Sequence, residues 1–395
     1  MFHARRRQFR HPRTRALRRH HRRVSRGPHA TVAHLPRSRR CRCRARARVG
    51  AGMTVETLAE RGARYRPAVV HEMRAVIGEH GDELSGWLRY HMGWEDRAGR
   101  SVAGAGGKML RPTALLLTHE LLGGALAQAL PAAAAVELAH NFSLLHDDIE
   151  DASETRHGRA TLWTFVGVAQ AVNAGDGMYT LARTALYRLL DAGVPHDRVL
   201  AAMRELDHAC LRLVHGQALD IGFEGQSQVT RAEYLEMAAG KTAAMFAASF
   251  ALGARLAGAE PAVVDGFRRF GHAIGIAFQA VDDVLGIWGV PEQTGKPVGD
   301  DLRARKMTLP VTTALEAGGE LAERLRAAYD VPPTAGEDVL PIARLIESAG
   351  GRAATETLAR ERVADGLAAL RAAGVDEGAA RACAEFAEAA VGRVT

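Results

Sequence analysis

The sequence predicts an all-α protein whose body is a single large helical bundle. Alanine, leucine, arginine and glutamate, which all favour helices, dominate the chain from about residue 54 onward. Apolar residues recur there at spacings of three and four, as in Val70, Met73, Val76 and Ile77, which is the spacing of one helix face. Alternating apolar and polar residues, which would indicate strands, are lacking.

Glycine and proline residues separate the predicted helices. Residues 193–195 and 258–261 fall between periodic apolar segments, where Gly and Pro commonly form turns. Residues 331–336 are predicted to form a loop, and no linker rich in Pro, Ser or Gly divides the body. The simplest interpretation is roughly ten to thirteen helices in one domain.

The first 50 residues differ from the rest in charge. They contain 18 arginines, no lysine and no acidic residue, whereas the whole chain has 52 basic and 45 acidic residues. The remaining residues therefore carry an excess of acids, although the chain as a whole has a formal charge of +7. Residues 1–52 show no hydrophobic period, and such a segment cannot bury enough apolar surface to fold.

We therefore interpret residues 1–52 as an Arg-rich disordered leader. An RNA- or anion-binding arm and a targeting peptide are two functional interpretations of such a segment. The other interpretation is GC-rich sequence read upstream of the true start codon, and we favour Met53 as the native start because an ordinary helical sequence follows it. The functional domain is expected to be residues 53–395.

The composition disfavours several classes of protein. Four cysteines without metal-ligand spacing argue against a zinc site or a disulfide framework, so a reducing compartment, the cytoplasm, is expected. Aromatic residues make up 5% of the chain, which disfavours nucleic-acid recognition by stacking on the body. No membrane span is expected, because the best apolar stretch, residues 121–139, is interrupted by Gln128 and Pro131.

The first chemical signal is the acidic segment DDIED, residues 147–151, which ends an apolar helical run. On a helix, Asp147 and Asp151 lie one above the other and Asp148 is adjacent. Carboxylates this close repel one another unless a cation lies between them. Oxygen ligands of this kind favour Mg²⁺, which binds carboxylates together with substrate phosphates. Taken alone, the segment is equally compatible with a solvated helix end.

The second signal is QAVDD, residues 279–283, which ends another apolar run. Twin acids at the end of a buried helix thus occur twice in one chain, at Asp147 and Asp148 and again at Asp282 and Asp283. Two such helices facing each other would form an acidic opening that could hold several Mg²⁺ ions.

The third signal is the use of lysine. Of the 52 basic residues only four are lysines, at positions 108, 241, 296 and 306. A chain that uses arginine almost everywhere is expected to keep lysine where its compact, flexible ammonium group has a specific task. Acids that bind Mg²⁺ and cations that bind phosphate together indicate a diphosphate substrate.

These segments resemble the trans-isoprenyl diphosphate synthases, the polyprenyl synthetase family, from about residue 105 to residue 310. The matching segments occur in the family's order: GGKMLRP (106–112), DDIED (147–151), ETRHG (154–158), GQALD (216–220), KT (241–242), FQAVDD (278–283), TGKPVGDDL (294–302) and KMTLP (306–310). The resemblance implies a helical bundle with a central cavity, across whose mouth the two acidic motifs face each other. It also implies roughly three Mg²⁺ ions per active site and a homodimer.

The resemblance also implies roles for individual residues. Three residues match the isopentenyl diphosphate site, namely Lys108, Arg111 and His140. At a further position of that site, His157 replaces the usual arginine. The metal and allylic diphosphate side corresponds to Asp147, Asp148, Asp151, Asp282, Asp283 and Gln279, with phosphate ligands Arg156, Lys241, Thr242, Lys296 and Lys306. Gln217 and Asp301 match positions that usually complete the site. The residues expected to carry the chemical step are Asp147, Asp148, Lys241 and Asp282.

Three departures from the family pattern stand out. The usual pair of arginines after the first motif is Arg156-His157, so the isopentenyl diphosphate site is expected to be weaker or sensitive to pH. The usual proline further on is Ala160. The second motif, usually DDxxD, reads DDVLG with Gly286 at the end, which should weaken metal binding without abolishing activity.

The resemblance implies Mg²⁺-dependent condensation of isopentenyl diphosphate with dimethylallyl, geranyl or farnesyl diphosphate. Phe142, five positions before Asp147, and Ser143 are the residues expected to set product length. On an ideal helix Ser143 lies beneath Asp147 but Phe142 lies some 140° away, so Phe142 is either the cavity floor or ordinary core. If Phe142 is a core residue, the cavity floor is expected to be formed by a facing helix, at Met178 or Tyr179. Bulk at this position is typical of synthases that stop at geranylgeranyl diphosphate.

Other functions remain as alternatives. A farnesyl diphosphate synthase is the nearest of them because the motifs are shared, although farnesyl diphosphate synthases often carry a bulky residue one position closer to Asp147, where this chain has the small Ser143. A non-catalytic partner subunit is supported only by His157 and Gly286. A class I terpene cyclase shares the fold but lacks an isopentenyl diphosphate site, which GGKMLRP argues against. Nucleic-acid binding by the leader alone would not involve the body.

Overall fold

The computed structural model describes most of the chain. The described residues are 56–78, 81–102, 107–224, 226, 228–290, 298–332, 334 and 336–392. The predicted leader, residues 1–52, and one predicted phosphate ligand, Lys296, lie outside them. The chain divides into two units, Met1–Thr54 and Val55–Thr395, and the helices described below belong to the second.

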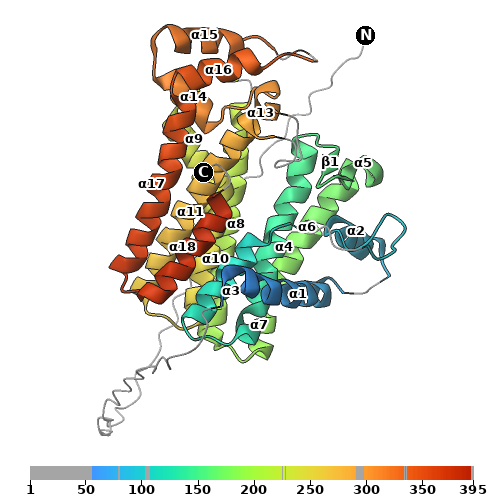
Figure 1. Cartoon of the computed structure of the whole chain (residues 1–395). Coiled ribbons are helices and arrows are strands. Elements are labelled where there is room, and N and C mark those ends of the chain that lie inside the picture. The colour runs from blue at the N-terminus through green and yellow to red at the C-terminus, as the bar shows by residue number, and fades with distance from the viewer. Residues whose placement is uncertain are drawn as a thin grey trace, which may run out of the picture. The chain divides into compact units, whose positions relative to one another are not determined.

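The second unit is an all-α bundle, as the sequence predicts (Figure 1). Its first half contains α1 (Leu58–Ile77), α2 (Glu83–His91), α3 (Leu110–Leu121), α4 (Leu126–Glu150), β1 (Thr155–Arg156), β2 (Arg159–Ala160), α5 (Trp163–Val166), α6 (Val168–Ala185) and α7 (Arg188–Asp191). Its second half contains α8 (His196–Phe223), α9 (Arg231–Ala238), the π-helix η1 (Ala239–Ala243), α10 (Ala244–Leu256), α11 (Pro261–Trp288), α13 (Asp300–Arg303), α14 (Leu309–Glu316), α15 (Gly319–Tyr329), α16 (Leu340–Ser348), α17 (Gly351–Ala372) and α18 (Glu377–Val391). Within the described part of the chain, the antiparallel pair β1–β2 is the only sheet.

The predicted turns lie where helices end. Residues 193–195 connect α7 to α8, and Pro261 begins α11 after the turn at Gly258. The described residues contain more helices than the sequence indicates, because α5, α7 and α13 have only four residues each. Helices this short cover barely one turn, which is too little for a hydrophobic period to be read.

Small residues bring the central helices close together. In α4, residues 132–135 are four consecutive alanines with no exposed surface. Gly216 on α8 faces Gly240 on η1, and a Cβ atom on Gly240 would lie 2.7 Å from the carbonyl oxygen of Arg212. The two backbones therefore touch directly, so a larger side chain at either glycine would push η1 away from α8.

The core continues along α10 and α11. Phe246 and Phe250 on α10 and Phe270 on α11 are fully buried, and the Phe250 and Phe270 rings meet edge to face at 4.8 Å. By length and composition alone α11 could cross a membrane, although the best apolar stretch predicted from the sequence was residues 121–139. Two thirds of its apolar window (67%) is buried inside the protein, where α10 and α17 pack against it, so its composition is accounted for by its place in the core.

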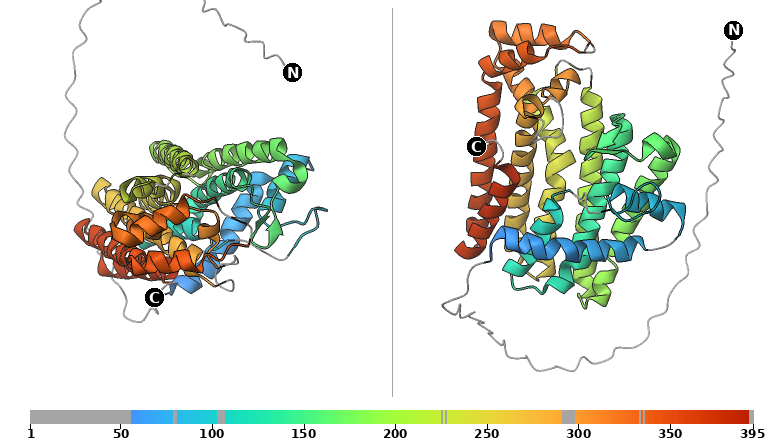
Figure 2. Two further views of the ribbon diagram at one scale, coloured as in Figure 1. Left: turned by 90° about the horizontal axis from the view of Figure 1, so that it is seen from above. Right: turned by 45° about the vertical axis from the view of Figure 1, so that its right-hand side comes forward.

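The long helices place both acidic motifs at one end of the bundle. Figure 2 shows α15 and α16 lying beyond the ends of the long helices, while α1 crosses the other end at a steep angle to them. The C-terminal ends of α4 and α11, which carry the first and second acidic motifs, lie toward the end of the bundle at which β1 and α13 are found (Figure 1).

Candidate active site

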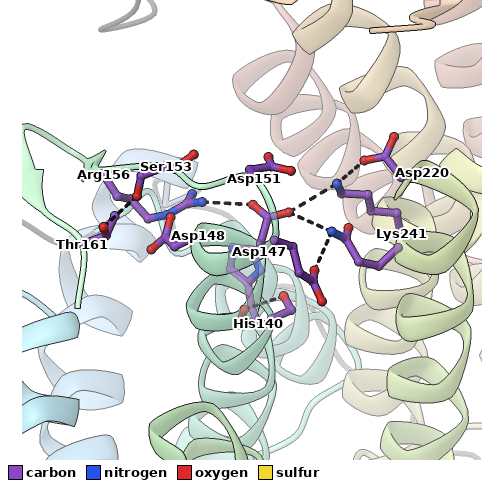
Figure 3. A network of polar contacts seen from close by, with 12 residues as sticks. His140, Asp147, Asp148, Asp151, Ser153, Arg156, Thr161, Asp220 and Lys241 are labelled. Atoms are coloured by element: carbon purple, nitrogen blue, oxygen red, sulfur yellow. Dashed lines mark hydrogen bonds and ion pairs between the residues drawn. The ribbon is translucent and has the colours of Figure 1, made fainter. Parts of the chain in front are cut away.

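The first acidic motif is neutralised by a basic side chain from the hairpin that follows it. α4 ends at Glu150, and the left-handed backbone of Ala152 (φ 48°) turns the chain back into β1. The Arg156 guanidinium then donates to Asp148 Oδ1 at 2.7 Å and to Asp147 Oδ2 at 3.0 Å (Figure 3). The hairpin reverses at His157 and Gly158, both with positive φ, and this tight turn keeps Arg156 above the two carboxylates.

A lysine from the opposite side also reaches Asp147. Lys241 Nζ lies 3.4 Å from Asp147 Oδ1 and pairs with Asp220 on α8 (Figure 3). Lys241 belongs to η1, and π-turns inside helices are frequent at functional sites because they redirect side chains. Gln217 on α8 donates to Asp147 Oδ1 at 3.3 Å. Asp147 is therefore contacted from the hairpin, from η1 and from α8.

The surroundings shift the pKa values of the two carboxyls in opposite directions. Burial opposes ionisation of Asp147, but the charges of Lys241 and Arg156 outweigh it and its pKa is lowered. Burial dominates at Asp148, whose pKa is raised to about 6 although Arg156 opposes the shift. The pKa of Lys241 is raised, because the attraction of Asp220 and Asp147 exceeds the cost of burying its charge.

The second acidic motif is arranged differently. Asp283 is buried, and its Oδ2 accepts hydrogen bonds from the Tyr234 hydroxyl on α9 and from the Leu309 backbone N–H of α14 at 2.7 Å. Gln279 donates to its Oδ1 at 3.0 Å, while the Thr242 hydroxyl donates to Gln279. Burial raises the pKa of Asp283 to about 7. The structure thus places Asp283 among helix contacts, whereas Asp282 lines the two cavities described next and Asp283 lines neither of them.

Two cavities share a wall beneath the acidic motifs. One, which we call the basic cavity, has a volume of about 300 Å³, and the other, the mixed cavity, about 450 Å³. Seven residues line both: Arg111, His140, Leu144, Arg156, His157, Phe278 and Asp282. Two small molecules bound in these cavities would therefore meet beside Leu144 and Phe278, with charged groups around them.

The basic cavity has the features of an anion site. It is lined by four cationic side chains, from the loop before α3, from α3 and from the hairpin: Lys108, Arg111, Arg156 and Arg159. Arg111 Nε is buried and lacks a hydrogen-bond partner in the described part of the chain, so an anionic ligand would supply a missing acceptor. Burial lowers the pKa of Arg111 to about 10, which still leaves it protonated at neutral pH.

The histidines of the basic cavity are neutral at pH 7. Burial, with help from nearby arginines, lowers the pKa of His140 well below its ordinary value and that of His91 to about 3. His157 is exposed on the hairpin, and burial of its ring and the charge of Arg156 lower its pKa as well. At neutral pH these rings act as hydrogen-bonding groups rather than as charges.

The mixed cavity is polar at one end and apolar along its wall. Asp147, Lys241, Thr242, Gln279 and Asp282 contribute its polar atoms. Its remaining wall includes Phe142, Ser143, Leu213, Val214 and Ile221. The Phe142 ring packs against Tyr179 on α6 with ring centres 5.0 Å apart. Two of the three residues considered for the cavity floor, Phe142 and Tyr179, therefore meet at this wall, whereas the third, Met178, is fully buried.

The remaining predicted residues lie around the mouth. Asp151 caps α4, and its Oδ2 lies 3.5 Å from Lys306 Nζ, which comes from the segment between α13 and α14. Neither residue lines either cavity. Since Lys306 joins the end of the first motif to the segment after the second, it connects the two sides of the opening.

Several residues that the sequence analysis did not single out also build the site. Tyr234 holds Asp283, Glu137 lines the basic cavity, and Arg159 is held there by the backbone oxygens of Tyr90 and Glu95. A buried acid in an apolar run was a usable signal for Glu137. No local signal identifies Tyr234, because its partner lies 49 positions away in sequence.

The fold and the site together define a class. This is a helical-bundle enzyme in which carboxylates from two helices, lysines and arginines surround a pair of joined cavities, a combination suited to diphosphate substrates. Residues 93–346 match the polyprenyl synthetase family, and the chain belongs to that family.

Relatives and solved structures agree with this assignment. The chain is 44% identical to a (2E,6E)-farnesyl diphosphate synthase of Mycobacterium tuberculosis over 78% of this chain and 87% of the relative. It is also 44% identical to a geranylgeranyl diphosphate synthase of the same organism over 80% and 88%. A polyprenyl synthetase from Streptomyces coelicolor superposes with a TM-score of 0.79, at 38% identity and covering 85% of this chain and 99% of that one. A geranylgeranyl pyrophosphate synthase from Corynebacterium glutamicum in complex with isoprenyl diphosphate and magnesium superposes with a TM-score of 0.72, at 28% identity and covering 85% and 99%. The chain is thus a prenyltransferase of the trans-prenyl diphosphate synthase type.

Proposed function

We propose that this enzyme condenses isopentenyl diphosphate with allylic diphosphates and releases mainly geranylgeranyl diphosphate. The observation that carries this proposal is the pair of joined cavities, one cationic and one with a polar mouth and an apolar wall. Isopentenyl diphosphate would occupy the basic cavity, with Lys108, Arg111 and His140 on its wall. The allylic diphosphate would occupy the mixed cavity, with its chain along Phe142.

The carboxylates of the opening fit Mg²⁺. Asp147 on α4 and Asp282 on α11 line the same cavity, and carboxylate oxygen is the donor that Mg²⁺ prefers. In the described part of the chain, no group of three or more Asp, Glu, His or Cys side chains is already arranged to hold a metal ion. Arg156 pairs with both Asp147 and Asp148, and Lys241 pairs with Asp147. We propose that Asp147, Asp148 and Asp282 hold the ions, about three in number.

The residues around the mouth then divide the chemistry. When bound, Mg²⁺ would supply positive charge to the departing pyrophosphate. Lys241, Thr242 and Arg156 would bind the same phosphates and stabilise the charge that develops when the allylic C–O bond breaks. The double bond of isopentenyl diphosphate attacks the resulting allylic cation beside Leu144 and Phe278, whose apolar surfaces exclude water. Loss of a proton to the released pyrophosphate then completes a five-carbon extension.

Product analysis tests this proposal. We expect the purified protein with Mg²⁺, farnesyl diphosphate and isopentenyl diphosphate to form a twenty-carbon product, seen by chromatography after dephosphorylation. Failure to extend farnesyl diphosphate, with synthesis of it from shorter substrates, would instead indicate a farnesyl diphosphate synthase. If the purified protein alone shows no turnover, the result would instead indicate a non-catalytic partner subunit.

Phe142 is proposed to limit product length. Phe142→Ala removes an aromatic ring from the wall of the mixed cavity and should shift the products toward longer chains. Leu145→Ala is the matched control, because Leu145 lies on the same helix and is buried but lines neither cavity. An unchanged product distribution for Phe142→Ala would show that Phe142 is an ordinary core residue. Tyr179 would then be the residue expected to limit product length.

We further propose that the enzyme is a homodimer that works in the cytoplasm. Apolar side chains stand exposed on α6 and α8, among them Val168, Leu200 and Leu211, the last with 71% of its surface accessible. A second copy of the chain would cover such a surface. Light scattering should give twice the monomer mass for the wild type, and Leu211→Glu should shift the protein toward monomer. The two buried free cysteines, Cys210 and Cys383, are compatible with a reducing compartment.

A further inference from the structure

The short helix α13 ends in a turn whose central residue is an arginine in a left-handed conformation. The Lys306 N–H donates to the Asp301 carbonyl oxygen at 2.9 Å, and the Arg305 N–H donates to the Leu302 carbonyl oxygen at 3.1 Å. These two backbone hydrogen bonds form a Schellman motif, in which the left-handed residue is usually glycine. Arg305 occupies that position with φ 51°. A side chain in this conformation strains the backbone, and such strain persists only where surrounding contacts enforce it.

The Arg305 side chain supplies such contacts. The side chain is buried, and its guanidinium donates to both carboxylate oxygens of Glu337, at 2.8 and 2.9 Å. It also donates to the carbonyl oxygens of Leu302 at 2.8 Å and of Val331 at 3.3 Å. The hydrogen bonds from Arg305 lower the pKa of Glu337, so this carboxylate is charged at neutral pH. Arg305 therefore fastens the segment that joins α15 to α16 to the end of α13, through charge-assisted hydrogen bonds.

A second contact ties the same region to residue 306. Tyr329, the last residue of α15, lies beside Arg305, with the guanidinium carbon 5.9 Å from the ring centre. Its hydroxyl donates to the Lys306 carbonyl oxygen at 3.3 Å. Figure 1 shows α13, α15 and α16 at the same end of the bundle. The backbone of Lys306 is thus held from α13 through the turn and from α15 through Tyr329.

The Lys306 side chain reaches from this backbone to the first acidic motif. Its Nζ lies 3.5 Å from Asp151 Oδ2. Burial opposes the charge of Lys306, but the attraction of nearby carboxylates, Asp151 first among them, outweighs it and the pKa of Lys306 is raised. Lysine carries its charge on a flexible four-carbon stem, so its backbone must be fixed if the ammonium group is to stay in place. The position of Lys306 at the acidic opening therefore depends on the turn that Arg305 fixes.

We propose that Arg305 is a positioning residue whose ion pair with Glu337 makes α15 and α16 a brace for Lys306 at the acidic opening. Glycine would form the same turn with less strain, but it could not fasten the segment before α16. This inference rests on the proposed function, in which the opening binds diphosphate. It gives α15 and α16, whose residues line neither cavity, a role in the reaction.

The variants Arg305→Gly and Lys306→Ala, alone and together, test the proposal. Arg305→Gly permits the left-handed turn and removes the guanidinium. We expect kcat/KM for the allylic diphosphate to fall by about 10–100-fold, as displacement of a group at an active site can cause. The KM for isopentenyl diphosphate should hardly change, because Lys306 does not line the basic cavity. In the Lys306→Ala background, Arg305→Gly should cause no further loss. Arg188→Ala, which breaks the ion pair with Glu72 at the other end of the bundle, is the matched control and should change neither value.

Steady-state kinetics with the allylic diphosphate varied give these values, and calorimetry of pyrophosphate binding with Mg²⁺ gives a second readout. Wild-type kcat/KM for either single variant would overturn the proposal, and so would losses that add in the double variant. If Arg305→Gly does not fold, Glu337→Gln replaces it with the same expectations. A wild type that binds pyrophosphate but shows no turnover would count against the proposed function alone. The pyrophosphate affinities of the same variants would then decide whether Arg305 acts through Lys306.

Discussion

The two acidic motifs begin with the same pair of aspartates, but their surroundings differ. On α4 both members of the pair meet Arg156, and both line a cavity. On α11 only Asp282 lines the cavities, while Asp283 receives hydrogen bonds from three donors within the bundle. Adjacent residues on a helix point about 100° apart, so one member of a pair can face substrate while the other faces the core. Identical residue pairs therefore lie in different surroundings, and we propose different tasks for them: catalysis for both aspartates on α4, and a division between catalysis and structure on α11.

The largest effect is expected at the first motif. Asp147→Ala removes a proposed metal ligand and leaves Lys241 and Arg156 facing each other without a carboxylate between them. We expect turnover at saturating Mg²⁺ and substrates to fall by about 10²–10³-fold or more. Asp265→Ala, which removes a surface carboxylate paired with Arg269, serves as control. Near-normal turnover of Asp147→Ala would contradict the catalytic role that we propose for the first acidic motif.

Substitutions in the second motif should separate activity from stability. Asp283→Asn puts an amide nitrogen against donors and should lower the free energy of unfolding by about 1–3 kcal/mol. Asp282→Asn should leave stability nearly unchanged but reduce turnover strongly, because Asp282 lines both cavities. Urea denaturation and steady-state kinetics measure the two quantities. Equal losses of stability for both variants would show that the pair shares one structural role.

The motifs should also differ in how pH changes stability in the presence of EDTA. The pKa of Asp283 is raised to about 7, so its contribution to stability is greatest at low pH and is lost as the pH rises toward 7. The pKa of Asp147 is lowered, so its contribution is present above about pH 4 and is lost as the pH falls below that value.

Urea denaturation of Asp283→Asn and Asp147→Asn at several pH values measures this difference. The loss of unfolding free energy caused by Asp283→Asn should shrink between about pH 4 and pH 7. The loss caused by Asp147→Asn should persist over that range and shrink only below about pH 4. Parallel pH profiles for the two variants would contradict opposite pKa shifts of the Asp283 and Asp147 carboxyls.

The smallest effect is expected beside the first motif, on the hairpin. His157 is neutral at pH 7 and lines the basic cavity, so His157→Arg adds a cation there. The KM for isopentenyl diphosphate should fall about tenfold, which corresponds to roughly 1.5 kcal/mol, the lower end of the range for a hydrogen bond to a charged group. The KM for the allylic substrate should hardly change. An unchanged KM for isopentenyl diphosphate would place His157 outside that site, and equal changes in both would indicate a general disturbance.

Much of the site could be predicted from the sequence because its parts are local. Asp147, Asp148 and Asp282 end apolar helical runs, and helix periodicity alone places them at one end of buried helices. The scarcity of lysine singled out Lys108, Lys241 and Lys306, all of which lie at or beside the opening. Residues 1–52 and Lys296 lie outside the described residues, so the expectations for them stay predictions.

Other features depend on contacts between residues far apart in sequence. The ideal helix left Phe142 undecided between cavity and core, and its position was decided by the packing of α6, which brings Tyr179 against it. The sequence predicts Asp283 as a metal ligand, and this stays a prediction, but only the structure shows that Tyr234 and Leu309 from other helices donate hydrogen bonds to it.

The sequence by itself therefore determined the all-α class, the order of the motifs and the kinds of chemical group at the opening. Helix propensity and periodicity are properties of neighbouring residues, and they suffice for these features. Only the tertiary structure decided that both carboxylates of the first pair line a cavity, whereas Asp282 alone of the second pair lines these two cavities. The direction of a side chain on a buried helix is fixed by the rotation of that helix against its neighbours, and this rotation is set by packing across the whole bundle.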